Sequence, residues 1–151
     1  MAWVRAFHCN SVYITHYQSM RVPVSLRTSY SMADKKALVD SGAMNNFINP
    51  PFAKRMKLGT RKLPQARKIW NIDGSLNKGG LLTDYINLEV QTKNERKLMR
   101  FLVTDLGGED IILGYPWLAM FKPPITWGTA TIDVSSLPII LQTIHPYRHQ
   151  E

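Results

Sequence analysis

One turn in the first third of the chain holds the residue types best suited to catalysis. Residues 39–43, Val-Asp-Ser-Gly-Ala, place an aspartate directly after an apolar run, and the apolar segment Ile111–Gly114 follows much later. An aspartate in such a turn can present its carboxylate at the floor of a cleft. An isolated Asp-Ser-Gly is more often an ordinary turn. If the triad is catalytic, its single occurrence in 151 residues means that one chain holds half a site and must pair with a second copy.

Composition argues against several other kinds of site. The only cysteine, Cys9, cannot form an internal disulfide. With His8 beside it, the pair falls short of the roughly four ligands of a tetrahedral zinc site. Cys9 and Ser41 also lack a histidine in a recognisable nucleophile motif, so covalent catalysis is not expected. We therefore expect no metal and no cofactor.

No membrane segment is expected from the apolar pattern. The longest apolar stretch, Ile111 to Phe121, is broken by Gly114 and Pro116. It is much shorter than the roughly 20 residues that a transmembrane helix requires. Residues 1–20 lack a basic start followed by a continuous apolar segment, so no signal peptide is expected either.

The net charge of +8 raises the question of an anionic partner such as nucleic acid. The cations are scattered, however, over residues 35–36, 54–68, 93–100 and 148. No helix or repeat gathers them into a stripe, and no zinc knuckle accompanies them. A solvated basic surface explains the charge better, and no specific nucleic-acid partner is expected. A basic nucleic-acid-binding domain stays as a lesser alternative, with steep loss of affinity in salt as its signature.

Apolar periodicity predicts a mostly-β chain around the turn. The predicted strands are 20–26, 37–39, 66–72, 85–90, 98–104, 111–113, 125–127, 131–134 and 137–144. Pro23 places the first of them at an edge of its sheet, because proline cannot donate to a ladder. Many short strands separated by turn signals, with two short helices, indicate a β-barrel or sandwich.

The first predicted helix begins after Asn49, which can cap free amides, and Pro50 suits its first position. Gly59 supplies its stop after two to three turns. The second runs from Pro116 to Phe121. Residues 1–18 read as an extension or linker, 19–144 as one domain and 145–151 as a tail or linker.

The turn at residues 39–43 is one of several segments that occur in a fixed order along the chain. These are Ala37–Ala43, Asn46–Leu58, Asn71–Gly80, Arg100–Leu118 and Pro124–Trp127. In this order and spacing the chain resembles the retropepsin-like aspartic proteases of retroviruses, and more closely those of gypsy-type LTR retrotransposons. With their spacers the segments cover roughly residues 19 to 135. The resemblance implies a small closed β-barrel, active as a homodimer with one site at the subunit interface.

The resemblance also implies roles for individual residues. Asp40 would be the catalytic aspartate, and the Ser41 hydroxyl would lock the two turns of the dimer together. Gly42 would let those turns approach closely, since it has no Cβ. Residues 69–80 would form a flap that closes over substrate. The residues expected to line or support the substrate site are Ala43, Ile72, Asp73, Gly74 and Ile112.

The implied activity is hydrolysis of peptide bonds by two carboxylates. At hydrogen-bonding distance both cannot ionise cheaply, so they share one proton, a pattern known for aspartic proteases as a class. The ionised member acts as general base on a water, and the protonated member hydrogen-bonds the scissile carbonyl. An extended peptide would bind by strand addition. We expect a cytoplasmic endopeptidase, or one within virus-like particles, that processes a retroelement Gag-Pol polyprotein.

This chain departs from retroviral members at two places. Tyr115-Pro116 follows the glycine of the apolar segment, where retroviral members often carry a charged pair. Met44-Asn45 replaces a small Thr-Gly pair after the triad. Met44-Asn45 and the unusual N-terminal extension motivate an alternative: a catalytically inactive or domesticated retropepsin-fold module that dimerises or binds extended peptides. Residues 19–27 and 137–144 are candidates for the dimer interface, since retroviral members use their terminal strands there.

Overall fold

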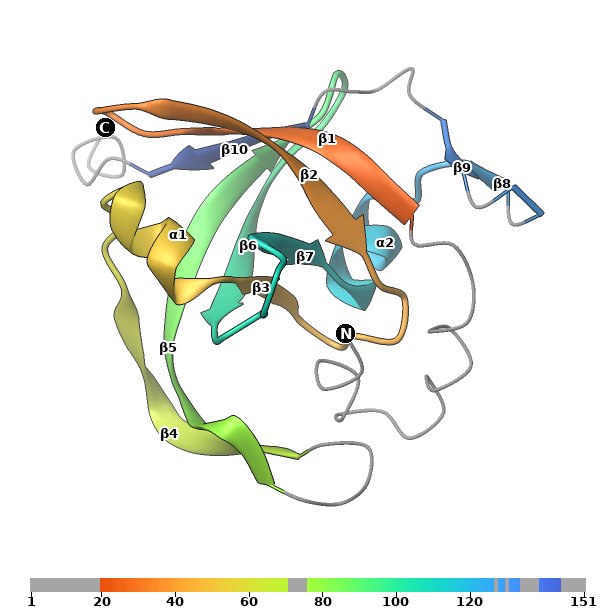
Figure 1. Cartoon of the computed structure of the whole chain (residues 1–151). Helices are drawn as coiled ribbons and strands as arrows, with labels where there is room; N and C mark the ends of the chain where they lie inside the picture. Colours follow the sequence, from red (N-terminus) through yellow and green to blue (C-terminus); the bar gives the residue numbers. More distant parts are fainter. Residues whose placement is uncertain (1–19, 71–75, 127, 130, 134–138, 145–151) are drawn as a thin grey trace.

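The computed structural model describes residues 20–70, 76–126, 128–129, 131–133 and 139–144 (Figure 1). Strands and two short helices make up most of these residues. In chain order they are β1 (Met20–Arg27), β2 (Met32–Val39), β3 (Asn46–Ile48), α1 (Pro50–Arg55), β4 (Arg61–Trp70), β5 (Leu76–Gln91), β6 (Arg96–Val103), β7 (Ile111–Leu113), α2 (Tyr115–Phe121), β8 (Ile125–Thr126), β9 (Thr131–Ile132) and β10 (Ile139–Thr143).

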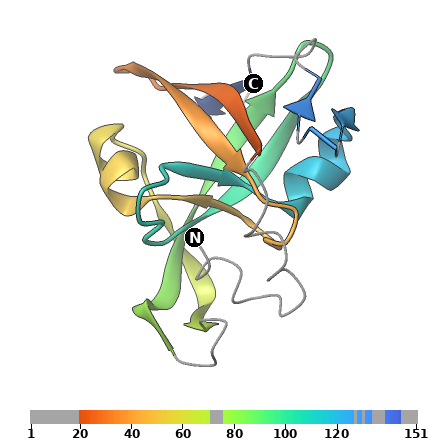
Figure 2. The ribbon, with the colours of Figure 1, turned by 45° about the vertical axis from the view of Figure 1, so that its right-hand side comes forward.

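Eight of the described strands form one sheet, in the order β10-β1-β2-β7-β3-β6-β5-β4. An additional pairing of β10 with β5 closes the sheet into a barrel and leaves β4 outside, attached to β5 alone. The two helices lie on opposite sides of the strands (Figure 2). The predicted small, closed, mostly-β barrel with two short helices is therefore confirmed. Within the described residues, no helix is long and apolar enough to cross a membrane.

The apolar core has two parts, and β7 separates them. Ile111 and Leu113 pack into a large cluster that also takes residues from β1, β5, β6 and β10. Ile112 points to the other side, into a smaller cluster with Leu38, Ala43 and Phe47. This short strand is thus buried on both faces, as its continuous apolar run predicts. Ala43 belongs to the smaller cluster, so the end of the turn at residues 40–43 is anchored in the apolar core.

Pro23 is not on an edge strand, so that prediction is wrong. β1 pairs antiparallel with β2 along its whole length and parallel with β10 from Val24 onward. Pro23 precedes the pairing with β10, so on that side no ladder bond is lost. Within the eight-stranded sheet, the strand with one described neighbour is β4. It contains Pro64, which lies in the register shift between Lys62 and Arg67.

The first helix starts as predicted and ends earlier. Asn49 occupies the N-cap position, but its side-chain oxygen accepts a hydrogen bond from the Leu106 N–H at 3.0 Å instead of capping the helix. The helix has six residues and ends at Arg55. Lys57 then takes a left-handed conformation, and the Leu58 N–H donates to the Ala53 carbonyl at 3.0 Å. This is a Schellman ending with Lys57 in the usual glycine position, so Gly59 is not the stop.

Several strands differ in extent from those predicted. β2 and β5 begin well before their predicted positions, because charged and small residues in their first halves break the apolar sequence pattern. β3 was not predicted, since its three residues follow the turn without a period of their own. The hairpin around Gly128 is present as β8–β9, and the last predicted strand as β10.

Asp84 ties the start of β4 to β5, at the base of the hairpin that carries the predicted flap. Its carboxylate accepts hydrogen bonds from Thr60 at 2.9 Å, Lys62 at 3.0 Å and Thr83 at 2.6 Å. The Thr83 hydroxyl, followed by Lys62, lowers the pKa of the Asp84 carboxyl below its ordinary value of 3.8. The ionised form is therefore favoured by folding.

This lowered pKa predicts a stability contribution that acid removes. Because the folded-state pKa is depressed, the contribution is present above the ordinary pKa and is lost as pH falls through the folded value. Asp84→Asn should lower the free energy of unfolding at pH 7 by less than about 1 kcal/mol, since the group is close to solvent. Urea unfolding at pH 7 and at pH values below 3.8 measures this. The loss in free energy of unfolding caused by Asp84→Asn should be smaller in acid. Asp34→Asn, on the exposed face of β2, should cause no such loss. If the loss caused by Asp84→Asn were equally large in acid, it could not come from the ionised Asp84 carboxylate.

Candidate active site

Asp40 follows β2 directly, where β2 runs parallel to β7. Leu38 and Val39 pair with Ile112 and Leu113, and the Asp40 N–H donates to the Leu113 carbonyl at 2.9 Å. The backbone then turns away from the sheet. The strand pairing thus determines where the aspartate is presented.

The turn is also fixed by its own hydrogen bonds. The Gly42 N–H donates to the Asp40 carboxylate oxygen Oδ1 at 3.0 Å, and the Ala43 N–H donates to the Asp40 carbonyl at 3.1 Å. Asp40 exposes 1% of its surface. A buried polar side chain needs hydrogen-bond partners, and the Gly42 N–H is one for Asp40. The side chain is therefore held in one orientation.

The segment after β7 holds the far side of this turn. The Tyr115 N–H donates to the Ala43 carbonyl at 2.7 Å, and the Gly114 N–H donates to the side-chain oxygen of Asn46 at 2.9 Å. The Asn46 amide in turn donates to the Arg100 carbonyl at 3.5 Å. Asn46 is buried, so it links three chain segments inside the protein.

Gly114 is required by close approach rather than by its backbone angles. A Cβ atom at this position would lie 2.2 Å from the Asn45 carbonyl oxygen and 2.6 Å from that of Ala43. Both contacts are with backbone, which cannot swing aside. Only glycine lets the end of β7 pass so close to the Asp40 turn.

Asn46→Ala is expected to destabilise the protein by about 1–3 kcal/mol, because it leaves the buried Gly114 N–H without an acceptor. Asn45→Ala is the matched control, since Asn45 approaches Gly114 through its backbone oxygen rather than its side chain. That control should change stability by no more than about 0.5 kcal/mol. Chemical denaturation of both variants measures the difference. Equal losses would contradict the role assigned to the Asn46 side chain.

The structure brings together most of the site residues expected from the sequence. Ser41 and Gly42 are half-buried in the same turn as Asp40. Ala43 and Ile112 are fully buried and pack in one cluster beneath it, so in this structure they support the turn. Their contact with a substrate stays a prediction. The expected flap residues Ile72, Asp73 and Gly74 lie outside the described residues.

The hairpin that would carry the flap is present in its described part. β4 and β5 pair antiparallel as far as Trp70 and Leu76. The hairpin extends well beyond the barrel (Figure 1). Gly80 has a φ of 69°, a conformation that favours glycine.

Sequence reasoning missed the roles of Asn46 and Asn49. Each is a buried asparagine whose side-chain oxygen accepts a backbone N–H from a distant segment, from Gly114 and from Leu106 respectively. The available signal was a polar residue on either side of the fully apolar Phe47-Ile48. That pattern indicates buried hydrogen bonding, but it does not identify the partners.

Asp105 and Asp110, the acidic residues that flank the Gly107-Gly108 loop, are turn and surface groups. Asp105 accepts the Gly107 N–H at 2.8 Å in an exposed turn, and Asp110 pairs with Lys35 at 3.0 Å. In the part of the chain that the structure describes, no three His, Cys, Asp or Glu side chains gather as a metal site would require.

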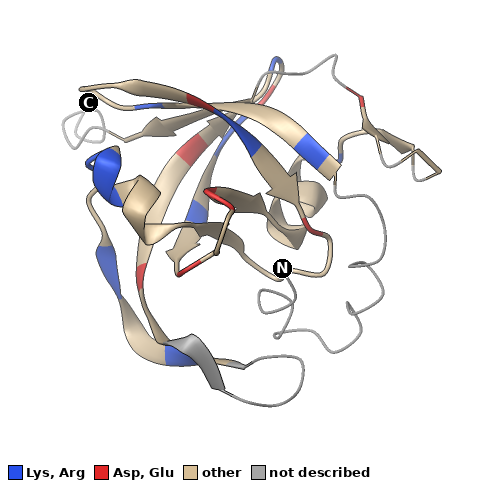
Figure 3. Ribbon diagram, in the orientation of Figure 1, with Lys and Arg blue, Asp and Glu red and all other residues tan. Residues whose placement is uncertain are grey.

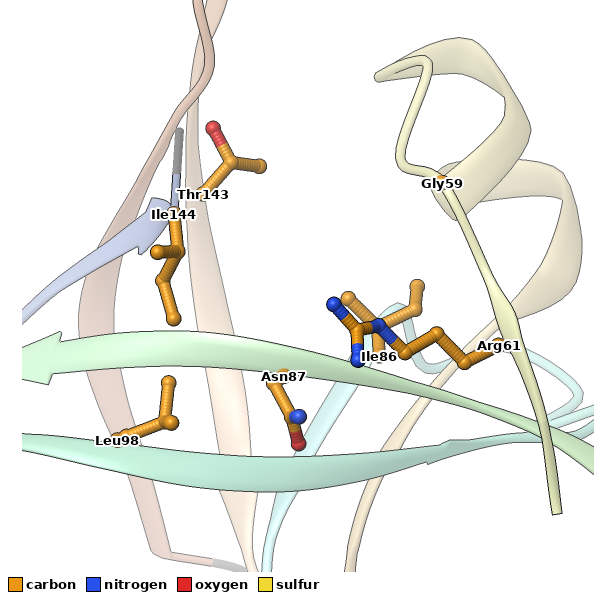
Figure 4. A pocket seen from close by; sticks show the side chains of 7 residues that line it. All are labelled: Gly59, Arg61, Ile86, Asn87, Leu98, Thr143 and Ile144. Carbon is orange, nitrogen blue, oxygen red and sulfur yellow. The ribbon is translucent and has the colours of Figure 1, made fainter. Parts of the chain in front are cut away.

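A separate cavity of about 580 Å³ opens on the barrel between β4, β5, β6 and β10. Its lining residues are Gly59, Arg61, Ile86, Asn87, Leu98, Thr143 and Ile144. The Arg61 side chain reaches toward Ile86 and Asn87, while Leu98 and Ile144 face each other (Figure 4). Of the expected site residues that the structure describes, none lines this cavity, so the cavity is distinct from the Asp40 turn.

Comparison with known proteins adds to this geometry. A family model described as the PEG10/RTL1 protease domain matches residues 36–139, which include the Asp40 turn, the β4–β5 hairpin and the β7–α2 segment. The chain belongs to the PEG10/RTL1 protease domain family. It is therefore a retropepsin-like protease domain, as the ordered segments indicate.

Among solved structures, the chain is similar to the retroviral protease-like domain of Ddi1 from Leishmania major. The two share 18% sequence identity, and the match covers 83% of this chain and 92% of that one, with a TM-score of 0.49.

Proposed function

We propose that this member of the PEG10/RTL1 protease domain family is an aspartic endopeptidase that works as a homodimer. The observation that carries the proposal is the Asp40 turn, in which strand pairing and backbone hydrogen bonds hold one carboxylate in a fixed position. Asp-Ser-Gly is intact, and the buried packing beneath it is complete. Catalytic side chains must be held in position by the packing and hydrogen bonds of neighbouring residues, and the Asp40 turn meets that requirement.

One copy supplies one carboxylate of this kind, and the proposed chemistry needs two. The Asp40 carboxylates of two copies, facing each other across a two-fold axis, share one proton. The ionised one takes a proton from a bound water, whose oxygen attacks the peptide carbonyl carbon. The protonated one donates a hydrogen bond to the carbonyl oxygen as negative charge develops there. Proton transfer to the leaving nitrogen then completes the cleavage.

The proposed substrate is an extended segment of a polyprotein, of the Gag-Pol type that the resemblance suggests. An extended peptide offers backbone donors and acceptors along its length, and a long β-hairpin beside the site can pair with them. Alternate side chains then enter pockets on either side. We place this activity in the cytoplasm or in virus-like particles.

A diverse mixture of peptides, incubated with the protein between about pH 4 and pH 7, tests the proposal, because the reaction requires one carboxylate protonated and the other ionised. Mass spectrometry of the products should show internal cleavage at a limited set of sites. Binding of extended peptides without turnover, at concentrations where the protein is dimeric, would contradict it and favour a non-catalytic module.

A further inference from the structure

The cavity of Figure 4 lies where β5 changes its neighbour along one edge. On that edge β5 pairs with β4 as far as Tyr85 and with β10 from Leu88 onward, while β6 occupies the other edge. Ile86 and Asn87 therefore lie between the two pairings, and both line the cavity. A strand turns the backbone N–H and C=O groups of successive residues to opposite edges, so one of these two residues directs its backbone groups into the gap.

Two polar side chains reach the same gap. Arg61, at the start of β4, extends toward Ile86 and Asn87, and Thr143 and Ile144 lie across the opening from it (Figure 4). Within the described residues, neither the Arg61 nor the Asn87 side chain has a hydrogen-bond or ion-pair partner. A guanidinium group can hold a carboxylate by two parallel N–H donors, and a side-chain amide both donates and accepts. The cavity thus offers hydrogen bonds that the described part of the chain does not use.

Apolar side chains form the other part of the lining. Leu98, on β6, is 52% exposed, Ile144 is half-buried, and the two face each other across the cavity (Figure 4). Ile86 is buried at its base. The cavity volume of about 580 Å³ lies within the range of ligand pockets, which combine such apolar walls with a few polar groups. An aliphatic side chain of a ligand would cover Leu98, which the chain leaves exposed.

The charge around the cavity favours an anionic ligand. Residues 54–68 hold seven Lys or Arg and no Asp or Glu, and Figure 3 shows blue on the end of α1 and on β4. Both carboxylates of β5 already have partners, since Asp84 pairs with Lys62 at 3.0 Å and Glu89 with Arg96 at 3.4 Å. The potential near Arg61 is therefore positive, and a carboxylate from another molecule would be stabilised there.

We propose that this cavity is a second peptide-binding site, for an extended segment of another protein that carries an aliphatic side chain and a carboxylate. The segment's backbone pairs with the groups that β5 directs into the gap, as in strand addition. Its aliphatic side chain lies between Leu98 and Ile144, and its carboxylate accepts hydrogen bonds from Arg61. A fatty acid would also match Arg61 and the apolar wall, but it would leave the backbone groups of the gap without partners.

The geometry of an extended chain sets the spacing of the two side chains. Residues i and i+2 of a strand point to the same face, so the aliphatic and acidic residues should be separated by one residue. The proposal does not depend on the proposed function, because the Asp40 turn contributes no group to this cavity.

Fluorescence anisotropy with the full chain tests the proposal. The probe is a labelled peptide, Gly-Ser-Leu-Ser-Glu-Ser-Gly, capped at both ends, with versions that carry Ile or Phe for Leu and Asp for Glu. Arg61→Ala should raise the dissociation constant of the acidic peptide by about tenfold or more. It should have much less effect on the peptide in which Gln replaces Glu, because the lost interaction is with the carboxylate.

Matched controls separate this contact from the general positive charge. Lys62→Ala removes the same charge one residue away, from a side chain that bonds Asp84 instead. It should change the dissociation constant by no more than about twofold. Leu98→Gln should weaken binding several-fold, whereas Met120→Gln, at a 42% exposed position of α2, should not. Circular dichroism should show an unchanged fold in all four variants, since each replaced side chain is exposed.

Other occupants give different results, and each of these would overturn the proposal. Sodium octanoate that displaces the probe as well as unlabelled peptide does would assign the cavity to fatty acids. Self-association that Arg61→Ala abolishes, without peptide binding, would assign it to a second copy of the chain. No binding of any probe peptide at millimolar concentration, or equal weakening by Arg61→Ala and Lys62→Ala, would leave no peptide site there.

The Asp40→Asn variant distinguishes this site from the candidate active site. It should bind the probe as tightly as the native chain does, whether or not the native chain cleaves peptides. Binding that disappears in Asp40→Asn would place the probe at the Asp40 turn and refute the second site. Binding that depends on Arg61, in a chain that never cleaves peptides, would support the second site and refute the endopeptidase.

Discussion

Asp40→Asn is expected to abolish peptide hydrolysis while leaving the fold intact. The amide is nearly the same size as the carboxylate, and its oxygen can still accept the Gly42 N–H. It cannot, however, take a proton from water. In a homodimer the substitution removes both carboxylates at once, so the loss of general acid–base catalysis should reach or exceed about 10²- to 10⁴-fold in kcat. Cleavage assays on the variant and on the native chain measure it.

Asp105→Asn is the matched control for that variant. Asp105 also accepts the N–H two residues ahead, from Gly107 at 2.8 Å, but it lies exposed in a different turn. The Asp105→Asn variant should cleave peptides at the native rate. Specific cleavage that survives Asp40→Asn would show that another group performs the chemistry, and an equal loss in both variants would point to disturbed turns rather than a lost base.

Gly114→Ala should destabilise the protein strongly. Its methyl group would lie 2.2 Å and 2.6 Å from two backbone carbonyl oxygens, so the Asp40 turn or the end of β7 must move. Forcing atoms into a packed interior costs about 3 kcal/mol or more in such a case. Since the displaced carbonyls belong to Ala43 and Asn45, cleavage should fall together with the free energy of unfolding.

Gly59→Ala tests whether the effect belongs to this position. A Cβ at Gly59 would meet nothing within 4 Å, and the residue has no positive φ. Alanine there should be neutral or stabilise the protein by up to about 1 kcal/mol, because it restricts the unfolded chain. Urea denaturation compares the two variants. A Gly114→Ala variant as stable as Gly59→Ala would mean that the two loops can separate freely.

The sequence was most informative where a residue's chemistry is local. An apolar run followed by Asp-Ser-Gly predicts a strand that delivers a carboxylate into a turn, and β2 and Asp40 follow that pattern. The apolar Ile111–Leu113 segment likewise predicts a strand buried on both faces. Both inferences need only neighbouring residues.

The sequence was least informative where partners are distant. Pro23 predicted an edge strand, but β1 has a neighbour on each side. The pairing with β10, the last strand, starts only at Val24, so Pro23 does not interrupt it. Asn49 looked like a helix cap, but Leu106 competes successfully for its oxygen. Lys57 adopts the left-handed conformation that glycine usually takes, because the burial of Leu58 completes that helix end. Each outcome depends on tertiary contacts that override a local preference.

The concentration dependence of peptide cleavage tests the central claim most directly. If two Asp40 residues from two copies make one site, the initial rate should rise with the square of protein concentration below the dimer dissociation constant. It should become linear above that constant, at the concentration where sedimentation detects dimers. A rate that is linear throughout, from a protein that sediments as a monomer, would contradict the shared site.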